Sequence, residues 1–553
     1  MKEDLAKRMI ASALAEGSGQ KDLTAYDCLP VDDLMPTYNE MPSEFGSHSL
    51  RLNLTSELTD RICAKGWGER ICVHFDGEHI SYNEMQLVTD RIVQLLGEEL
   101  GVVSGNRVLL VGGNSPMWIA TFLAILKLGA IAVPILKTAT QSEITEILKV
   151  AQPTAAVIDE SCLDARSAFK AWRGLEHSAA FFNPKFSGVG DLNARIQTKL
   201  GQCEPANTSK RTIACLMFTS GSTGKPKGVV HYHGDLLAHP DIFGPYVTQP
   251  QPEDVFGGTP SFAFLYGLMN LLITPLRYGA SLAIFDQGYP QKLLSLIEEE
   301  SVTIVISVPK VYRSIIPIAE HYELGSIRIS ISSGEILAED TRLEWSRITN
   351  NPVIDGFGTS ELATTFMISF HPHDADSIGR PLPGYSLKLL PIDNSQVGTG
   401  RLFVRGPTGC KYYDNPSAQQ RSVVDGWTST GDIFSVDGQG NYRHISRADD
   451  IINIDGFNVS PQEVEAALGV HAAVNDCVVY KNPDDSKLAA LIVLHSNGAD
   501  QKEILVSIKQ WCAEKLSAHK RPQEFKFVPS VPRTANGKLQ RFRIHDFCEG
   551  TSE

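Results

Sequence analysis

The sequence lacks paired cysteines, and two common uses of cysteine are thereby excluded. Its ten cysteines, spread over 553 residues, form no C-x-x-C pair and no cluster of cysteine and histidine with the spacing of a zinc site. We therefore predict neither a disulfide framework nor a zinc module, but a reduced, cytoplasmic protein. The first residues, Met1 to Leu5, lack the apolar stretch of a secretory signal, so we expect no signal peptide.

Long runs of like charge are also missing. The formal net charge is −14, from 64 acidic and 50 basic residues that are mixed along the chain. Neither nucleic acid nor an anionic membrane is therefore expected as the main partner. Any phosphate group must be bound by local lysines and arginines.

No apolar segment is uniform enough to cross a membrane. The most apolar one, residues 118–136, contains Thr121, Lys127, Gly129 and Pro134. Because these residues interrupt the segment, we predict a buried helix followed by a strand, with no membrane span.

What the sequence does contain is an alternation of short apolar runs and helix-like segments, which is typical of βαβ units and parallel sheets. At 553 residues the chain exceeds one ordinary core, so we expect two or more domains. Strands separated by Gly and Asp turns follow over residues 386–445, and residues 450–553 indicate a compact α+β unit. The predicted fold class is α/β, with a large N-terminal domain of parallel-sheet βαβ layers, a β-rich subdomain and a small α+β C-terminal domain. The strands predicted for the βαβ layers are 108–111, 131–136, 155–158, 281–285, 303–308 and 327–332.

Residues 219–228, Thr-Ser-Gly-Ser-Thr-Gly-Lys-Pro-Lys-Gly, follow an apolar run and are suited to bind phosphate. Glycines let backbone N–H groups approach an anion, and the hydroxyls and lysines add donors. The stretch is not a Walker A loop, because only two residues separate Gly221 from Gly224. By itself, such a composition is more often a flexible loop. The residues that we expect to contact phosphate are Thr219, Ser220, Gly221, Ser222, Thr223, Gly224 and Lys227.

Two further motifs carry carboxylates suited to a nucleotide. In residues 355–361, a Gly-x-Gly turn precedes the hydroxyl of Ser360 and the carboxylate of Glu361. One carboxylate suffices for Mg²⁺, which prefers few protein ligands plus phosphate oxygens. Asp432, in a Thr-Gly-Asp turn, is suited to accept the hydroxyls of a ribose. Taken alone, the first motif equally fits a loop with a solvated glutamate, and the second is more often a plain turn.

The order of these motifs resembles that of the adenylate-forming ligases, the superfamily of acyl- and aryl-CoA synthetases, peptide-synthetase adenylation domains and beetle luciferases. The resemblance runs from Thr219 to residues 533–538. Segments 263–268, 355–361 and 456–461 are most similar to the benzoate- and 2-aminobenzoate-CoA ligases. The resemblance implies an enzyme that activates a carboxylic acid to acyl-AMP with ATP and Mg²⁺, releases pyrophosphate, and passes the acyl group to CoA.

The resemblance also assigns roles to individual residues. Ser360 would contact phosphate and Glu361 would bind Mg²⁺. Lys538 would lie where the carboxylate attacks the α-phosphate, because negative charge builds up there and a mobile ammonium offsets it. Asp449 would be the hinge, within residues 447–450, between a domain of residues 1–446 and a mobile domain of residues 451–553. The other residues implied are Gly334 and Glu335 on the adenine side, Asp355 and Phe357 beside the base with Gly356 and Gly358 in the same turn, Asp432 and Arg447 on the ribose, and Gly456 on the CoA side.

The pocket for the acid is implied at Phe264, Tyr266, Gly267, Met269 and Thr364. Benzoate-type ligases usually have glycine where Met269 stands and histidine where Thr364 stands. A methionine fills volume, and a threonine does not match the reach of an imidazole. We therefore expect benzoate and 2-aminobenzoate to be poor substrates, and a different aromatic, cyclic or small carboxylic acid to be preferred.

Two alternatives stay open at the level of sequence. The acyl group could pass to a carrier protein or to an amine in place of CoA. Alternatively, the chain could be an inactive adenylate-binding scaffold, although such a protein has no physical need to retain Glu361, Asp432, Arg447 and Lys538 together. Both a monomer and a homodimer are compatible with the sequence.

Overall fold

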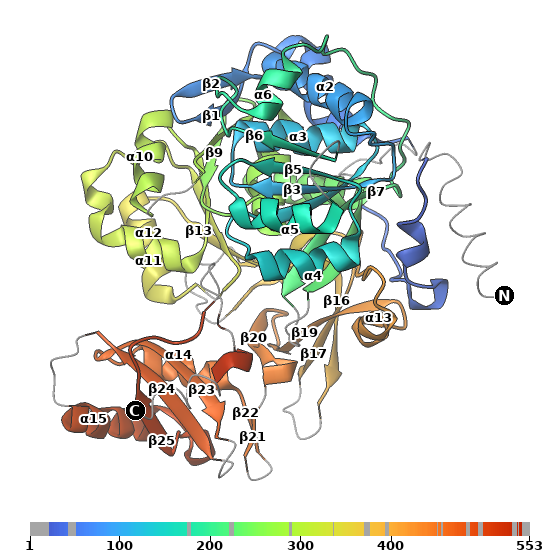
Figure 1. The fold of residues 1–553 in the computed structure, drawn as a ribbon. Helices are drawn as coiled ribbons and strands as arrows, with labels where there is room; N and C mark the ends of the chain where they lie inside the picture. Colours follow the sequence, from blue (N-terminus) through green and yellow to red (C-terminus); the bar gives the residue numbers. More distant parts are fainter. Residues whose placement is uncertain are drawn as a thin grey trace. The chain divides into compact units, whose positions relative to one another are not determined.

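The computed structural model describes residues 21–42, 51–173, 178–220, 226–286, 290–335, 337–369, 377–392, 398–450, 452–454, 457–482, 487–495, 501–533, 539 and 541–544. These residues form two compact units (Figure 1). The first unit holds the chain up to Leu387 together with Phe403–Ser429, and the second holds Lys388–Leu402 and the chain from Thr430 onward. The predicted domain boundaries at residues 446 and 451 are the two sides of a hinge about which the C-terminal domain would rotate. These boundaries stay a prediction.

A six-stranded sheet forms one layer of the first unit, in the order β6-β5-β3-β4-β7-β8. The strands from β6 to β7 run parallel, and β8 folds back antiparallel to β7. The buried helix and the strand expected in residues 118–136 are confirmed as α3 and β4, and every residue of α3 is buried. The strands are β3 (Arg107–Gly112), β4 (Ile131–Leu136), β5 (Ala155–Asp159), β6 (Ala179–Phe182), β7 (Ile213–Ser220) and β8 (Pro226–Tyr232). The helices of this region are α2 (Tyr82–Glu98), α3 (Pro116–Lys127), α4 (Gln141–Ala151), α5 (Leu163–Arg173), α6 (Asp191–Ile196) and α7 (His233–Phe243).

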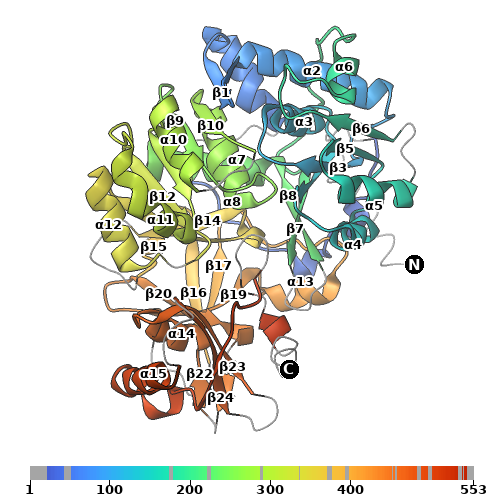
Figure 2. The same ribbon diagram turned by 60° about the vertical axis from the view of Figure 1, so that its left-hand side comes forward.

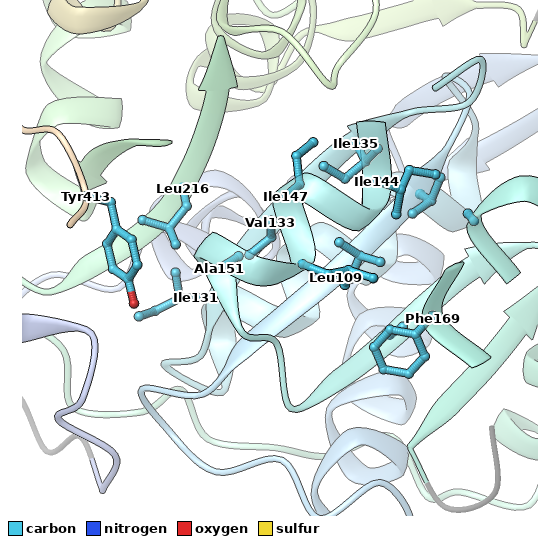
Figure 3. Packing of buried hydrophobic residues seen from close by; sticks show 14 of the residues in the cluster. Leu109, Ile131, Val133, Ile135, Ile144, Ile147, Ala151, Phe169, Leu216 and Tyr413 are labelled. Carbon is cyan, nitrogen blue, oxygen red and sulfur yellow. The ribbon is translucent and has the colours of Figure 1, made fainter. Parts of the chain in front are cut away.

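Apolar side chains of β3, β4, α4 and α5 form a buried core on one face of this sheet (Figure 3). The helix α4 begins at a capping box, in which Thr140 and Glu143 exchange hydrogen bonds and satisfy free backbone N–H groups. Its apolar side chains then recur at helical spacing and face the sheet. Core side chains labelled in Figure 3 include Leu109, Ile131, Val133, Ile144, Ile147 and Phe169.

A nine-stranded sheet forms the other layer, in the order β15-β14-β13-β12-β11-β9-β10-β1-β2. Its six central strands, from β13 to β1, are parallel, and β2, β14 and β15 are antiparallel to their neighbours. Helices α10, α11 and α12 bury a second apolar core against it (Figure 2). The strands are β1 (Ile71–Phe75), β2 (Glu78–Ser81), β9 (Val255–Gly258), β10 (Ser281–Ile284), β11 (Ile304–Ser307), β12 (Ile329–Ser333), β13 (Val353–Thr359), β14 (Thr364–Ser369) and β15 (Arg380–Pro381). The helices are α8 (Leu265–Gly267), α9 (Thr274–Tyr278), α10 (Gln291–Glu300), α11 (Pro309–Ile315) and α12 (Glu339–Thr349).

The remainder of the chain is β-rich and then α+β. A five-stranded sheet has the order β16-β17-β19-β18, with β20 beside β19, and the division between the two units falls within β16, β17 and β19. The C-terminal part packs α14 and α15 on the three-stranded sheet β23-β24-β25. The predicted α/β fold class is therefore confirmed. The elements are β16 (Ser386–Pro391), β17 (Thr399–Arg405), α13 (Pro416–Ser422), β18 (Val423–Val424), β19 (Trp427–Val436), β20 (Tyr442–Arg447), β21 (Ile452–Ile454), β22 (Phe457–Val459), α14 (Pro461–Gly469), β23 (Val474–Lys481), β24 (Leu488–Leu494), α15 (Gln501–Lys515) and β25 (Glu524–Phe527).

Short 3₁₀ and π turns join these elements. Within the described part of the chain, no helix has the length and apolar character needed to cross a membrane. The short turns are η1 (Tyr26–Cys28), η2 (Asp32–Leu34), η4 (Ser56–Asp60), η5 (Cys63–Trp67), η6 (Gly244–Thr248), η7 (Leu268–Ile273), η8 (Ile316–His321), η9 (Ser360–Leu362), η10 (Ala448–Asp450), η11 (Ala518–Lys520) and η12 (Arg541–Arg543).

Candidate active site

The stretch predicted to bind phosphate joins the antiparallel strands β7 and β8. Thr219 lies opposite Lys227 in this ribbon, so the two described ends of the stretch are neighbours. The Nζ atom of Lys227 lies 5.6 Å from the ring centroid of Tyr412. The predicted phosphate contacts that lie outside the described residues are Gly221, Ser222, Thr223 and Gly224, together with the side chain of Ser220.

Glu361, the predicted Mg²⁺ ligand, is held by a tyrosine. It lies with Ser360 in the turn η9, directly after β13, and the hydroxyl of Tyr412 donates to Glu361 Oε1 over 2.6 Å. Tyr412 is itself fixed by a β-bridge to Val229 of β8. Burial, followed by the charge of Glu361, raises the pKa of Tyr412 well above its usual value, so the phenol remains a donor. Tyr412 therefore joins Lys227 and Glu361 in one cluster within the first unit.

Asp355 lies in β13 with 2% of its surface exposed. Its Oδ2 atom accepts a hydrogen bond from the backbone N–H of Leu337 at 3.4 Å, whereas Oδ1 is buried and has no partner among the described residues. Burial raises the pKa of Asp355 to about 7. Such a carboxyl group is suited to accept a hydrogen bond from a donor on a ligand, because an unsatisfied buried oxygen is costly.

The predicted adenine segment follows β12, the strand that pairs with β13. Gly334 and Glu335 are both exposed there. Gly334 has φ +95°, and among the described residues no atom lies within 4 Å of the position that a Cβ would take. Phe357 packs edge-on against Phe366, with ring centroids 5.6 Å apart. The two remaining predicted residues also lie in β13, where Gly356 pairs with Ser333 and Gly358 pairs with Thr365.

The residues predicted for the acid pocket differ in exposure. Phe264 and Tyr266 are half-buried, and the Tyr266 hydroxyl donates to the carbonyls of Ser307 and Ile331, at 2.8 and 3.2 Å. Met269 is fully buried in η7. Gly267, also predicted for the pocket, has no room for a side chain, because a Cβ there would lie 2.3 Å from the Ser261 carbonyl oxygen. The side chain of Thr364, the last predicted pocket residue, lies outside the described residues.

The predicted ribose residues meet in the second unit. Asp432 in β19 pairs with Arg447 in β20, and Arg447 Nε lies 3.0 Å from Asp432 Oδ1. His444 Nε2 lies 3.1 Å from the same oxygen. Asp432 is 1% exposed, and its Oδ2 atom has no hydrogen-bond partner in the described chain. Arg447 and His444 thus contact Oδ1 of Asp432, and Oδ2 is left to accept a hydrogen bond from a ligand hydroxyl.

The C-terminal residues predicted to be catalytic or to form the hinge are described only in part. Lys538 and Gly456 lie outside the described residues. Arg533 forms a β-bridge with Leu539 and an ion pair with Asp476, at 2.8 Å, at the base of the segment that carries Lys538. Asp449 lies in the turn η10. The next residue, Asp450, pairs with Arg541 at 3.1 Å, so the end of this turn is fixed within the second unit.

The family profile described as AMP-binding enzyme matches residues 61–413, and the profile of the AMP-binding enzyme C-terminal domain matches residues 463–538. The chain belongs to the AMP-binding enzymes. The benzoate–CoA ligase of Thauera aromatica is 29% identical over 511 residues, covering 89% of this chain and 96% of that protein. The anthranilate–CoA ligase of Pseudomonas aeruginosa is 30% identical over 460 residues, covering 80% and 87%. The crystal structure of the anthranilate CoA ligase AuaEII in complex with anthranoyl-AMP aligns with a TM-score of 0.83 at 27% identity, covering 91% of this chain and 98% of that one.

The described residues of this AMP-binding enzyme fit ATP and Mg²⁺. The partnerless oxygens of Asp355 and Asp432 match the donors of a base and a ribose, and the hydroxyl of Thr359 beside Ser360 is likewise buried without a partner among the described residues. The carboxylate of Glu361 is the type of ligand that Mg²⁺ prefers. ATP and Mg²⁺ are cofactors of the reaction, and the chain supplies hydrogen-bond acceptors and a carboxylate metal ligand suited to them.

Tyr412 and His444 were not identified from the sequence of this AMP-binding enzyme. Tyr412 contacts Glu361 from a segment that is distant in the sequence. His444 contacts Asp432 from the partner strand of a hairpin. The pairing of Asp432 with Arg447 fixes the register that brings His444 near. The turn Asp437 to Asn441 between β19 and β20 was the available sequence signal for this hairpin.

Proposed function

We propose that this enzyme activates a carboxylic acid with ATP and transfers the acyl group to CoA. The observation that carries the proposal is the cluster in which Tyr412 holds Glu361 beside Lys227, which lies at one end of the stretch predicted to bind phosphate. In the first step the acid carboxylate attacks the α-phosphorus of ATP, the bond to pyrophosphate breaks, and acyl-AMP forms. In the second step the CoA thiol displaces AMP, loses its proton and becomes a thioester.

In the first step, residues of the chain offset the negative charge of the phosphates and of the attacking carboxylate. Bound at Glu361, Mg²⁺ would neutralise charge on the phosphate oxygens. Tyr412 orients the Glu361 carboxylate, and Lys227 adds positive charge to the same cluster. We propose that Ser360 donates to phosphate and that Lys538 neutralises the negative charge that develops when the two anions meet.

Other residues bind the nucleotide in this proposal. The partnerless oxygen of Asp355 accepts a hydrogen bond from the base, next to the open surface at Gly334. Asp432 accepts the ribose hydroxyls, and Arg447 and His444 hold it in position for them. Gly456 takes part on the CoA side.

CoA is favoured as the acceptor because the relatives with long alignments are CoA ligases. Transfer to a carrier protein or to an amine is the alternative, and no observation on the described residues favours it. We further propose a cytoplasmic protein, a monomer or a homodimer, with the small-molecule acid and CoA as its partners. A catalytically inactive scaffold would not need the carboxylates of Glu361 and Asp432 to be held in position by Tyr412 and Arg447.

The acid is proposed to be aromatic, cyclic or small, and different from benzoate and 2-aminobenzoate. Met269 is fully buried, so its side chain occupies volume that a glycine would leave free. The Tyr266 hydroxyl is occupied by two backbone carbonyls, which leaves its ring as the part of the side chain able to meet a substrate. A hydrophobic pocket discriminates by about 1–3 kcal/mol per methylene, so shape alone should give partial rejection.

A hydroxylamine-trapping screen with ATP tests this function. The panel should contain benzoate, 2-aminobenzoate and other aromatic, cyclic and short aliphatic acids, and acids that respond should then be given CoA and analysed by mass spectrometry. We expect a hydroxamate from an acid other than the two benzoates, and its CoA thioester in the second assay. Met269→Gly, checked for folding, should shift the ranking toward bulkier rings. Absence of ATP–pyrophosphate exchange with every acid would contradict the proposed function, and benzoate ranking first would contradict the proposed pocket.

A further inference from the structure

Two histidines and a glutamate meet at the edge of the nine-stranded sheet. His74 lies in β1, His79 in β2, and Glu300 is the last residue of α10. Their possible ligand atoms, one per residue, all lie within 4.8 Å of one another. All three belong to the first unit, and none is among the residues assigned above to the nucleotide or to the acid.

The local sequence explains why the two histidines face each other. Asp76 and Gly77 both have positive φ, 50° and 81°, as a tight two-residue hairpin turn requires. This turn sets the register in which His74 lies directly opposite His79. Residues opposite each other on antiparallel strands point to the same face, so both rings lie on one side of the hairpin. Their centroids are 4.8 Å apart.

Glu300 contacts both rings through its carboxylate, and its Oε1 atom lies 3.4 Å from His79 Nε2. Its Oε2 atom lies 2.7 Å from His74 Nδ1 and 3.3 Å from His79 Nε2. The Nδ1 atom of His74 is buried, and the Glu300 carboxylate is its contact in the described part of the chain. The neighbouring carboxylates are engaged elsewhere, since Asp76 pairs with Lys185 and Glu78 accepts from Ser187.

We propose that His74, His79 and Glu300 form a binding site for a divalent transition-metal cation, zinc being the one that suits the ligands best. Two imidazoles and one carboxylate are a zinc ligand set, and ligands about 2.0–2.1 Å from a tetrahedral ion lie about 3.3 Å apart. The contact between His79 Nε2 and Glu300 Oε2 matches that separation at 3.3 Å, the contact between His74 Nδ1 and Glu300 Oε2 is shorter at 2.7 Å, and the ligand atoms of all three residues lie within 4.8 Å of one another. His79 is 52% exposed, which leaves a fourth position for water.

A cation at this site would link the β1–β2 hairpin to the end of α10. Binding to the folded chain alone would stabilise it in proportion to the logarithm of metal concentration over Kd. The pattern of His at 74 and 79 does not reveal the site in the sequence, because Glu300 comes from more than two hundred residues away along the chain. The site is independent of the acid-activating reaction.

Metal titration of the full-length protein tests the proposal. Protein treated with EDTA and transferred to metal-free buffer should be titrated with Zn²⁺ by calorimetry, and with Co²⁺ by absorption spectroscopy. We expect one equivalent of Zn²⁺ to bind, and a cobalt spectrum without the charge-transfer band of a cysteine ligand. Cysteine binding would be recognised by that band and would count against the site.

Variants decide whether these three residues are the ligands. His79→Gln and Glu300→Gln should each weaken zinc binding by about tenfold or more, since even indirect contacts to a metal ligand are worth that much. His321→Gln removes an exposed histidine of the same unit and should leave the affinity unchanged. Circular dichroism checks folding, and His79→Gln decides alone if Glu300→Gln does not fold. Wild-type affinity in His79→Gln, or no zinc binding by the wild type, would overturn the proposal.

Discussion

The hydroxyl of Tyr412 is the direct contact of the Glu361 carboxylate in the described chain, and it is a charge-assisted hydrogen bond of 2.6 Å. Removing a hydrogen bond to a charged group costs about 1.5–3 kcal/mol. Tyr412→Phe keeps the ring beside Lys227 and removes only this bond. We expect kcat/KM for MgATP to fall by about tenfold to a hundredfold, measured by pyrophosphate exchange.

Tyr413→Phe is the matched control for this change. Tyr413 is the adjacent residue, and its phenol contacts Cys28. Its loss should leave the dependence on Mg²⁺ and ATP close to that of the wild type. Equal effects of the two substitutions would mean that Tyr412 acts only by packing.

Asp355 gives a prediction for the dependence of stability on pH. Its pKa in the folded protein is about 7, raised by burial from 3.8, so between these values the folded chain binds more protons than the unfolded chain. Stability must then fall as pH rises through this window and level off above about pH 7. Asp355→Asn removes this dependence. The free energy of unfolding of the variant, relative to that of the wild type, should rise from pH 5 to pH 7 and then stay constant. At about 1.4 kcal/mol per unit of pKa, the total change is a few kcal/mol. Urea midpoints at each pH measure this change.

Parallel midpoints for the wild type and Asp355→Asn across pH 5 to 8 would contradict the perturbed carboxyl. Loss of ATP affinity in the same variant is a separate readout. It tests the proposed contact with the base, because an amide presents a donor as well as an acceptor.

Single residues were predictable from the sequence where a short motif carried them. Asp432 and Arg447 were named from their motifs, and the structure brings them into contact at 3.0 Å. Tyr412 and His444 were not, because a contact made across strands or between distant segments has no local pattern. The roles of all four residues stay predictions until they are measured.

At the scale of elements, the segment that carries Lys538 starts at Arg533, which bonds Asp476 and bridges to Leu539. Lys538→Ala should slow adenylation by about a hundredfold or more and largely spare the transfer of an acyl group from supplied acyl-AMP. Losing a charge contact made in the transition state costs on the order of 3 kcal/mol, about a hundredfold in rate. Pyrophosphate exchange measures the first half-reaction, and thioester formation from acyl-AMP measures the second.

Lys509→Ala, on the exposed face of α15, is the control for the lost positive charge. It should behave as the wild type in both assays. An unchanged exchange rate in Lys538→Ala would remove this lysine from the proposed mechanism.

The elements themselves were largely predictable, because apolar periodicity is a local property. The expected runs at 108–111, 131–136 and 155–158 are the strands β3, β4 and β5. The strand order was not predictable, since β9 lies between β10 and β11, and pairing is decided by packing between distant segments. The β1–β2 hairpin was missed although Asp76-Gly77 is a strong hairpin signal.

At the scale of the whole molecule, the family and the α/β fold class were both predictable, because the motifs follow the order of the adenylate-forming ligases. The identity of the carboxylic acid substrate was not predictable, because side chains from several elements shape its pocket. The proposed motion of the C-terminal domain is also outside what motifs determine, since such a motion depends on the energies of two conformations and not on one.

Asp449 provides the test of that motion. Proline fixes φ near −65° and removes the N–H donor, so Asp449→Pro restrains the backbone where the swing is proposed. We expect acyl-AMP formation to stay mostly intact and thioester formation to slow by about tenfold or more, as when a conformational step becomes limiting. Asp449→Ala is the matched control, because it removes the same carboxylate and leaves φ free. If alanine slows the thioester step as much as proline does, the side chain matters and not the hinge; if proline impairs both half-reactions equally, the residue has a structural role in η10, whose last residue is already held by Arg541.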